Sequence, residues 1–264
     1  MTTTGYAPVN GLKMYYEVHG EAREGARPLL LLHGALSGIG TSFGQLLPGL
    51  ADGRQVIATE LQAHGRTGNT DRPLEMGQLA DDAAALLAHL GVERADVLGY
   101  SLGAGVAMEL ASRRPELVGR LVVLSVSYST AGLHPGVLDG IDMLTPANLA
   151  GTPFEAEYAQ LAPNPGDWPA LLEKVKDLDR NLPEWPPERV AAITAPTLVV
   201  IGDSDIVRPE HAVEIFRLLG GGVAGDNVGL PASQLAILPG TTHITVPYQA
   251  ALLLPMLTAF LGAG

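Results

Sequence analysis

Short apolar runs that alternate with segments of helical periodicity place the strongest constraint on how this chain folds. Residues 28–32 contain four consecutive leucines and are followed by His33-Gly34. Such an apolar run suits a strand that is buried on both faces of a sheet. Further strands are predicted at 55–59, 95–98, 121–125, 197–201 and 234–238, and helices at 78–90, 102–114, 209–219 and 247–261. This alternation predicts an α/β fold in which helices flank a mostly parallel sheet.

Two glycine-containing segments lie outside the alternation. An Asn10-Gly11 pair precedes the extended run 13–18 and predicts an N-terminal hairpin. The glycine-rich residues 220–231 are predicted to form a mobile surface loop.

The longest interruption lies between residues 129 and 190. This segment has no clear strand and is rich in proline, which predicts short helices broken at the prolines. We expect it to form a helical cap inserted after the sixth strand. The chain is therefore divided into a core of residues 1–128 and 191–264 and a cap of residues 129–190.

Composition excludes several classes of function. The chain has 28 Asp and Glu against 16 Lys and Arg, a formal net charge of −12, so phosphate backbones and anionic membrane surfaces would repel it. The absence of cysteine rules out disulfides, thiolate metal sites and a cysteine nucleophile. Neither a secretory signal nor an apolar run long enough to span a bilayer is visible, and we expect a cytoplasmic protein.

The pentapeptide Gly99-Tyr100-Ser101-Leu102-Gly103 is the strongest chemical motif. It follows a predicted strand and precedes a predicted helix, which is the context needed to hold a serine hydroxyl out at a sharp turn. The helix N-terminus supplies free N–H groups and a favourable field for a developing negative charge. An ordinary glycine-flanked turn is the alternative, and the flanking strand and helix argue against it. Ser101 is therefore the candidate nucleophile.

Several motifs in this order resemble the α/β-hydrolase superfamily, in its single-domain branch with an inserted cap. The resemblance extends from Tyr15 to Leu261. The motifs are His33-Gly34, Gly65-Arg66, the pentapeptide at 99–103, Gly202-Asp203-Ser204-Asp205 and Gly240-Thr241-Thr242-His243. Together they are specific for the superfamily and much less specific for a substrate.

The resemblance implies a base and an acid for Ser101. His243 follows the last predicted strand, where the chain order serine, acid, histidine places the base. The acid follows the strand at 197–201, where Asp205 matches the triad position and Asp203 remains the alternative. For Asp203 we also consider a turn-stabilising role through nearby backbone amides. His64 lies at the same end of the sheet, and the resemblance implies a supporting role for it.

The resemblance also implies an oxyanion hole made by the backbone N–H groups of Leu102 and Ala35. The loop at His33-Gly34-Ala35 has one glycine, unlike the glycine-rich loop of some lipases and esterases. The resemblance implies that this single-glycine form leaves less room beside the acyl carbon and turns over bulky tertiary-alcohol esters poorly.

We expect hydrolysis of carboxylic esters of small or medium, largely apolar substrates. A serine nucleophile argues against the dehalogenases and epoxide hydrolases that attack through a carboxylate. No cofactor is expected, because no strand is followed by a dinucleotide motif, and no metal is expected, because no cluster has metal-ligand spacing. A lactonase, a carbon–carbon bond hydrolase, a perhydrolase of the cofactor-free haloperoxidase type and a hydroxynitrile lyase are the alternatives within enzymes. A non-catalytic binding protein is the alternative outside them.

The substrate pocket is expected to draw on the cap and on the neighbours of Ser101 and His243. A small-molecule ester is the expected partner, without nucleic acid or membrane, and the oligomeric state stays open between monomer and dimer. The candidate pocket residues are Tyr100, Met143, Phe154, Tyr158, Trp168, Trp185 and Ile244.

Overall fold

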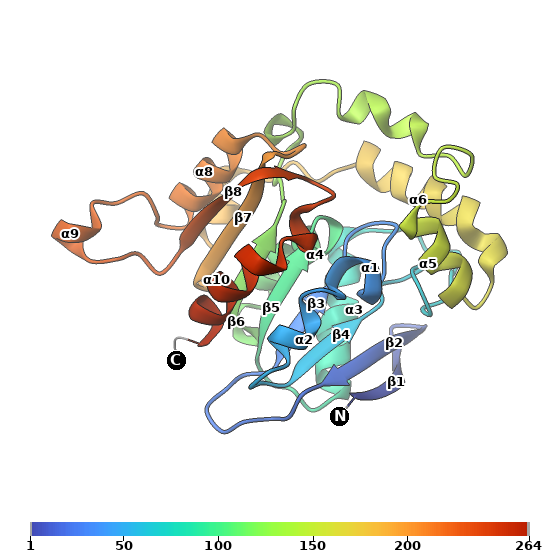
Figure 1. Cartoon of the computed structure of the whole chain (residues 1–264), viewed down its shortest axis with the longest axis horizontal. Coiled ribbons are helices and arrows are strands. Elements are labelled where there is room, and N and C mark those ends of the chain that lie inside the picture. The colour runs from blue at the N-terminus through green and yellow to red at the C-terminus, as the bar shows by residue number, and fades with distance from the viewer. Residues whose placement is uncertain (1, 263–264) are drawn as a thin grey trace.

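One sheet of eight strands forms the centre of the molecule (Figure 1). The computed structural model describes residues 2–262. The strand order is β1-β2-β4-β3-β5-β6-β7-β8, in which β1–β2 and β2–β4 pair antiparallel and all other pairs are parallel. The strands are β1 (Thr2–Val9), β2 (Leu12–His19), β3 (Leu29–Leu32), β4 (Val56–Thr59), β5 (Ala95–Tyr100), β6 (Val118–Leu124), β7 (Thr197–Ser204) and β8 (Gln234–Thr242). The fold class predicted from the sequence is confirmed.

Helices cover both faces of this sheet because successive side chains of each buried strand point to opposite sides. Leu30 and Leu32 pack on the face covered by α3 (Met76–His89), α4 (Leu102–Arg113) and α8 (Pro209–Leu218). Leu29 and Leu31 pack on the other face. That face is covered by α1 (Ile39–Phe43), α2 (Leu47–Leu50) and α10 (Ala250–Gly262). The two apolar layers hold the carboxyl ends of the parallel strands at one edge, where the motif residues gather.

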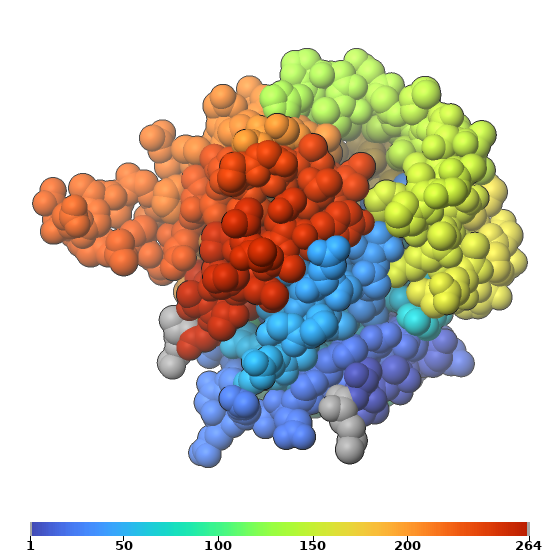
Figure 2. All heavy atoms as spheres, in the orientation of Figure 1, coloured from blue at the N-terminus to red at the C-terminus, as the bar shows by residue number. Residues whose placement is uncertain are grey.

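Several boundaries differ from the predicted ones for local reasons. The hairpin turn is present, and Asn10 and Gly11 have φ of 45° and 83°, as a tight turn between twisted strands requires. The predicted helix at 247–261 is divided into a 3-10 turn, Val246–Tyr248, and α10, because Gln249 leaves the helical region with ψ of 48°. The predicted loop at 220–231 contains the short helix α9 (Gly225–Val228), which projects from the molecule (Figures 1 and 2). A further 3-10 turn, Pro115–Leu117, precedes β6.

The chain between β6 and β7 forms the cap. Its helices are α5 (Pro153–Leu161), α6 (Trp168–Arg180) and α7 (Pro187–Ala191), with 3-10 turns at Thr130–Gly132, Leu138–Met143 and Pro165–Asp167. Figure 2 shows this segment, green to yellow, arched over one side of the core.

One carboxylate fastens the cap to the core beside the motif residues. Glu157 of α5 accepts hydrogen bonds from the backbone N–H groups of Gly38, at 2.7 Å, and Thr41, at 3.0 Å. These groups belong to the first turn of α1, where backbone donors lack partners within the helix. The contact therefore fixes α5 against the loop that follows β3.

Candidate active site

Ser101 lies at the carboxyl end of β5, on the sharp turn that leads into α4. Its φ of 51° and ψ of −116° are unusual for a residue with a side chain. The two glycines of the motif permit this turn. A β-carbon at Gly103 would lie 2.0 Å from the carbonyl oxygen of Leu32, and one at Gly99 would lie 2.2 Å from that of Gly103. The motif therefore has glycines where the turn passes against neighbouring backbone, and the serine side chain is held away from the sheet.

Three side chains that are far apart in the sequence meet at this turn. The hydroxyl of Ser101 lies 2.9 Å from Nε2 of His243, and Nδ1 of His243 lies 2.9 Å from Oδ1 of Asp205. Because Asp205 can only accept when ionised, Nδ1 carries the ring proton, and Nε2 is free to accept a proton from the hydroxyl. Tyr100 donates from its hydroxyl to the carbonyl oxygen of His243 at 2.9 Å and so fixes the loop that carries the ring.

Asp205 is held ionised by hydrogen bonds from three directions. Burial alone would raise the pKa of Asp205, but hydrogen bonds from His243, from the Ser125 hydroxyl and from the Val207 N–H keep it below its ordinary value. Ser125 follows β6, has a φ of 57° and donates to Oδ2 at 2.5 Å. Ser125 was not among the site residues predicted from the sequence.

Asp203, the alternative acid, has a different set of partners. Its carboxylate accepts from the N–H groups of Gly240, at 2.9 Å, and Thr241, at 3.2 Å. These two hydrogen bonds lower the pKa of Asp203. Asp203 therefore ties the end of β7 to the loop that carries His243, and Asp205 is the carboxylate that contacts the ring.

Two buried histidines fix the loop after β3. Nε2 of His33 accepts a hydrogen bond from the N–H of Leu61 at 2.9 Å, and Nδ1 of the same ring lies 2.7 Å from the carbonyl oxygen of Gly34. His64 accepts from the N–H of Leu36 at Nε2, 3.0 Å. Burial lowers the pKa of His33 to about 4 and that of His64 to about 3, so both rings are neutral and each can accept at one nitrogen while donating at the other. The supporting role expected for His64 agrees with these contacts.

This arrangement orients the peptide between Gly34 and Ala35. The carbonyl oxygen of Gly34 accepts from His33 and from the Ser37 hydroxyl, at 2.8 Å. Because the C=O and N–H of a trans peptide point in opposite directions, the N–H of Ala35 points away from these partners. Within residues 2–262, neither this N–H nor that of Leu102 has a hydrogen-bond partner. Both residues line the cavity beside Ser101. Two residues with free N–H donors therefore line the cavity that Ser101 also lines.

The cavity beside Ser101 has a volume of about 390 Å³ and lies between the core and the cap. Its wall is mostly apolar, and its aliphatic side chains come largely from 133–149 and from α6. Of the predicted pocket residues, Tyr100, Phe154 and Ile244 line this cavity.

The other four predicted pocket residues lie elsewhere. Tyr158 and Trp168 pack against each other in the cap, with ring centroids 5.1 Å apart, and are buried. Met143 is 65% exposed. Trp185 lies in a neighbouring hollow, where the guanidinium of Arg189 stacks 3.7 Å from its ring centroid. Aromatic residues of the cap thus serve mainly to pack the cap itself.

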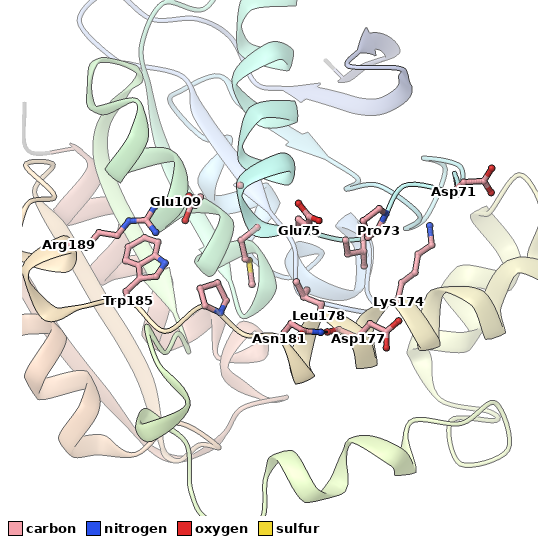
Figure 3. A pocket seen from close by; sticks show the side chains of 14 residues that line it. Asp71, Pro73, Glu75, Glu109, Lys174, Asp177, Leu178, Asn181, Trp185 and Arg189 are labelled. Carbon is pink, nitrogen blue, oxygen red and sulfur yellow. Dashed lines mark hydrogen bonds and ion pairs between the residues drawn. The ribbon is translucent and has the colours of Figure 1, made fainter.

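The hollow that contains Trp185 is larger, about 570 Å³, and lies on the side of α6 that faces α3 and α4 (Figure 3). Its charged side chains are largely engaged with protein. Arg189 donates to Glu109 at 2.8 Å, and Lys174 donates to the backbone carbonyl of Arg72 at 2.8 Å. Leu178 lines both spaces. None of Ser101, His243 and Asp205 borders this hollow.

Two other kinds of feature are absent from the described residues. In residues 2–262, no group of three or more His, Asp or Glu side chains is placed to hold a metal ion. No helix in the same range is both long enough and apolar enough to cross a bilayer.

Comparison with known proteins agrees with this fold. A family model described as the alpha/beta hydrolase fold matches residues 27–185, more than half of the chain. The chain belongs to the alpha/beta hydrolase family.

Two curated relatives match part of the chain. A protein of Rhizobium rhizogenes named "Putative carbamate hydrolase RutD" is 34% identical over 125 residues, which are 47% of each chain. The 2-hydroxymuconate semialdehyde hydrolase of a Pseudomonas species is 33% identical over 118 residues, 44% of this chain and 40% of the relative. The matches therefore span less than half the length of these curated relatives.

A solved structure matches the alpha/beta hydrolase chain over nearly its whole length. It is the 2-hydroxy-6-oxo-6-phenylhexa-2,4-dienoate hydrolase of a Rhodococcus species, with a TM-score of 0.77 and 18% identity. The match covers 100% of this chain and 99% of that one. At this identity the likeness establishes the fold.

Proposed function

We propose that the chain is a serine hydrolase that cleaves carboxylic esters of small or medium, largely apolar substrates. The observation that carries the proposal is the contact chain from Ser101 through His243 to Asp205, at 2.9 Å in each step, beside two free N–H groups. An apolar cavity of about 390 Å³ borders these groups and suits an acyl or alcohol chain.

In the proposed reaction, His243 takes the proton of the Ser101 hydroxyl as its oxygen attacks the ester carbonyl carbon. The oxyanion that forms accepts from the N–H groups of Ala35 and Leu102. His243 then gives its proton to the departing alcohol, which leaves an acyl-enzyme on Ser101. Water attacks this ester while His243 takes its proton, and return of that proton to the serine oxygen releases the acid. Asp205 orients the ring and stabilises its charged form throughout.

The test compares wild type with Ser101→Ala on short-chain 4-nitrophenyl esters. We expect kcat/KM to fall at least about 10⁴-fold, because the nucleophile is removed. Ser112→Ala, on α4 and outside the cavity, is the matched control and should keep its activity. Equal rates for wild type and Ser101→Ala would overturn the proposal.

A fluorophosphonate probe separates catalysis from simple ligand binding. We expect one label on Ser101 of the wild type, identified by peptide mass spectrometry, and none on Ser101→Ala. A folded wild-type protein that stays unlabelled would favour a non-catalytic binding role. Lactone and carbamate substrates on the same panel address the other hydrolytic alternatives, and peroxide with acetate addresses perhydrolysis.

A further inference from the structure

Asp179 is the acidic side chain that lines the Ser101 cavity from the cap. It lies near the end of α6 and is half-buried, in a wall that is otherwise apolar on this side. No lysine or arginine within residues 2–262 lines the same cavity. Among the described residues no carboxylate of the core lines this cavity, so Asp179 supplies its negative charge.

Within the described part of the chain, the Asp179 carboxylate has no hydrogen-bond or ion-pair partner. The two cations nearest in sequence are engaged elsewhere: Lys176 pairs with Glu173 at 2.7 Å, and Arg180 pairs with Asp142 at 2.6 Å. Asp179 does act electrostatically on His243, which places it near the reacting groups. Burial raises the pKa of Asp179 to about 6, as expected for a carboxylate with little solvent and no donor.

An unpaired carboxylate in an apolar cavity is unfavourable unless a ligand supplies the missing partner. We propose that Asp179 selects substrates that carry a cationic nitrogen, and this rests on the proposed ester hydrolysis at Ser101. The net charge of −12 also favours the approach of cations. A substrate with a second carboxylate would be repelled by Asp179.

The experiment uses two pairs of esters that match in shape and differ in charge. Choline butyrate and 3,3-dimethylbutyl butyrate place the charge on the alcohol. The 4-nitrophenyl esters of 6-(trimethylammonio)hexanoate and 7,7-dimethyloctanoate place it on the acyl group. The ratio of kcat/KM for the cationic ester to that for the neutral one is measured in wild type, Asp179→Asn and Asp177→Asn. Asp177 is the matched control, since it lies on the same helix, carries the same charge and pairs with Arg180 at 3.3 Å.

We expect Asp179→Asn to lower this ratio roughly tenfold for at least one pair, through loss of a charge pair in a partly desolvated site. The Asp177→Asn ratio should stay within about twofold of wild type, because an exposed charge is screened. A ratio unchanged by Asp179→Asn in both pairs would overturn the inference.

A binding measurement tests the role of Asp179 without relying on ester hydrolysis. Calorimetry compares Ser101→Ala with the double variant Ser101→Ala, Asp179→Asn, using the same esters. Weaker binding of the cationic ester alone in the double variant supports the inference, and equal binding overturns it. If wild type turns over no ester, the proposed function fails while this comparison still decides the role of Asp179.

Discussion

Replacing Asp179 by asparagine should stabilise the fold at neutral pH. The pKa of Asp179 rises from 3.8 to about 6 on folding, and each tenfold change in a protonation equilibrium corresponds to about 1.4 kcal/mol. The ionised carboxylate therefore lowers the free energy of unfolding by up to about 3 kcal/mol at pH 8. Partial exposure reduces this figure, and we expect a gain of about 2 kcal/mol for Asp179→Asn.

The sign of the pH dependence follows from the raised pKa. Below about pH 3 the carboxyl group is mostly protonated in both the folded and the unfolded states, so asparagine and aspartate differ little. As the pH rises from 3 through 6, the unfolded state ionises first, and the native aspartate protein loses stability relative to the variant. The advantage of Asp179→Asn should therefore grow over this range and level off above pH 7.

Urea unfolding at pH 4 and pH 8 measures this difference. Asp177→Asn is again the control. Both residues lie in the last turn of α6, so each substitution removes the same unfavourable interaction of a carboxylate with the helix dipole. A variant Asp179→Asn that is less stable than wild type at pH 8, or that gains equally at both pH values, would refute the reasoning.

Three further predictions concern the groups around the triad. Ser125→Ala removes a hydrogen-bond donor to Asp205, so the pKa of Asp205 should rise. We expect kcat to fall about tenfold and the acid limb of its pH profile to move to higher pH. Glu157→Gln removes the charge from the bonds that hold the cap to α1, and urea unfolding should show a loss of about 1 kcal/mol. Asp205→Asn should lower kcat about 10⁴-fold, whereas Asp203→Asn should change kcat less than about tenfold and lower the melting temperature.

The sequence predicts the core of the site well because the signals are local. Ser101 is marked by two glycines that the backbone turn requires, and His243 and Asp205 follow predicted strands whose carboxyl ends meet at one edge. The geometry brings these three together at hydrogen-bond distance. Their catalytic roles stay a prediction until the variants are measured.

The cap was harder to predict because its contacts depend on how it packs. Large aromatic residues suggested a pocket wall, but Tyr158 and Trp168 pack on each other instead. A signal for Asp179 was present in the sequence. It lies seven residues after Leu172 and four after Val175, and so falls in the apolar stripe of α6. Lys176 lies in the same stripe and pairs with Glu173, so Asp179 is the charge there that has no partner among the described residues.

The cap can retain this unfavourable charge because the same helix is anchored strongly elsewhere. Leu171, Leu172 and Val175 of α6 are at most 1% exposed, and burial of each such side chain contributes about 1.5–3 kcal/mol. Their sum exceeds the roughly 3 kcal/mol upper bound for the Asp179 carboxylate. Selection for stability alone would favour a neutral residue at this position, since the variant is expected to be more stable. The proposed pairing of Asp179 with a cationic substrate would offset this cost only when substrate is bound, which is the reason the ester ratio and the unfolding free energy should move in opposite directions in Asp179→Asn.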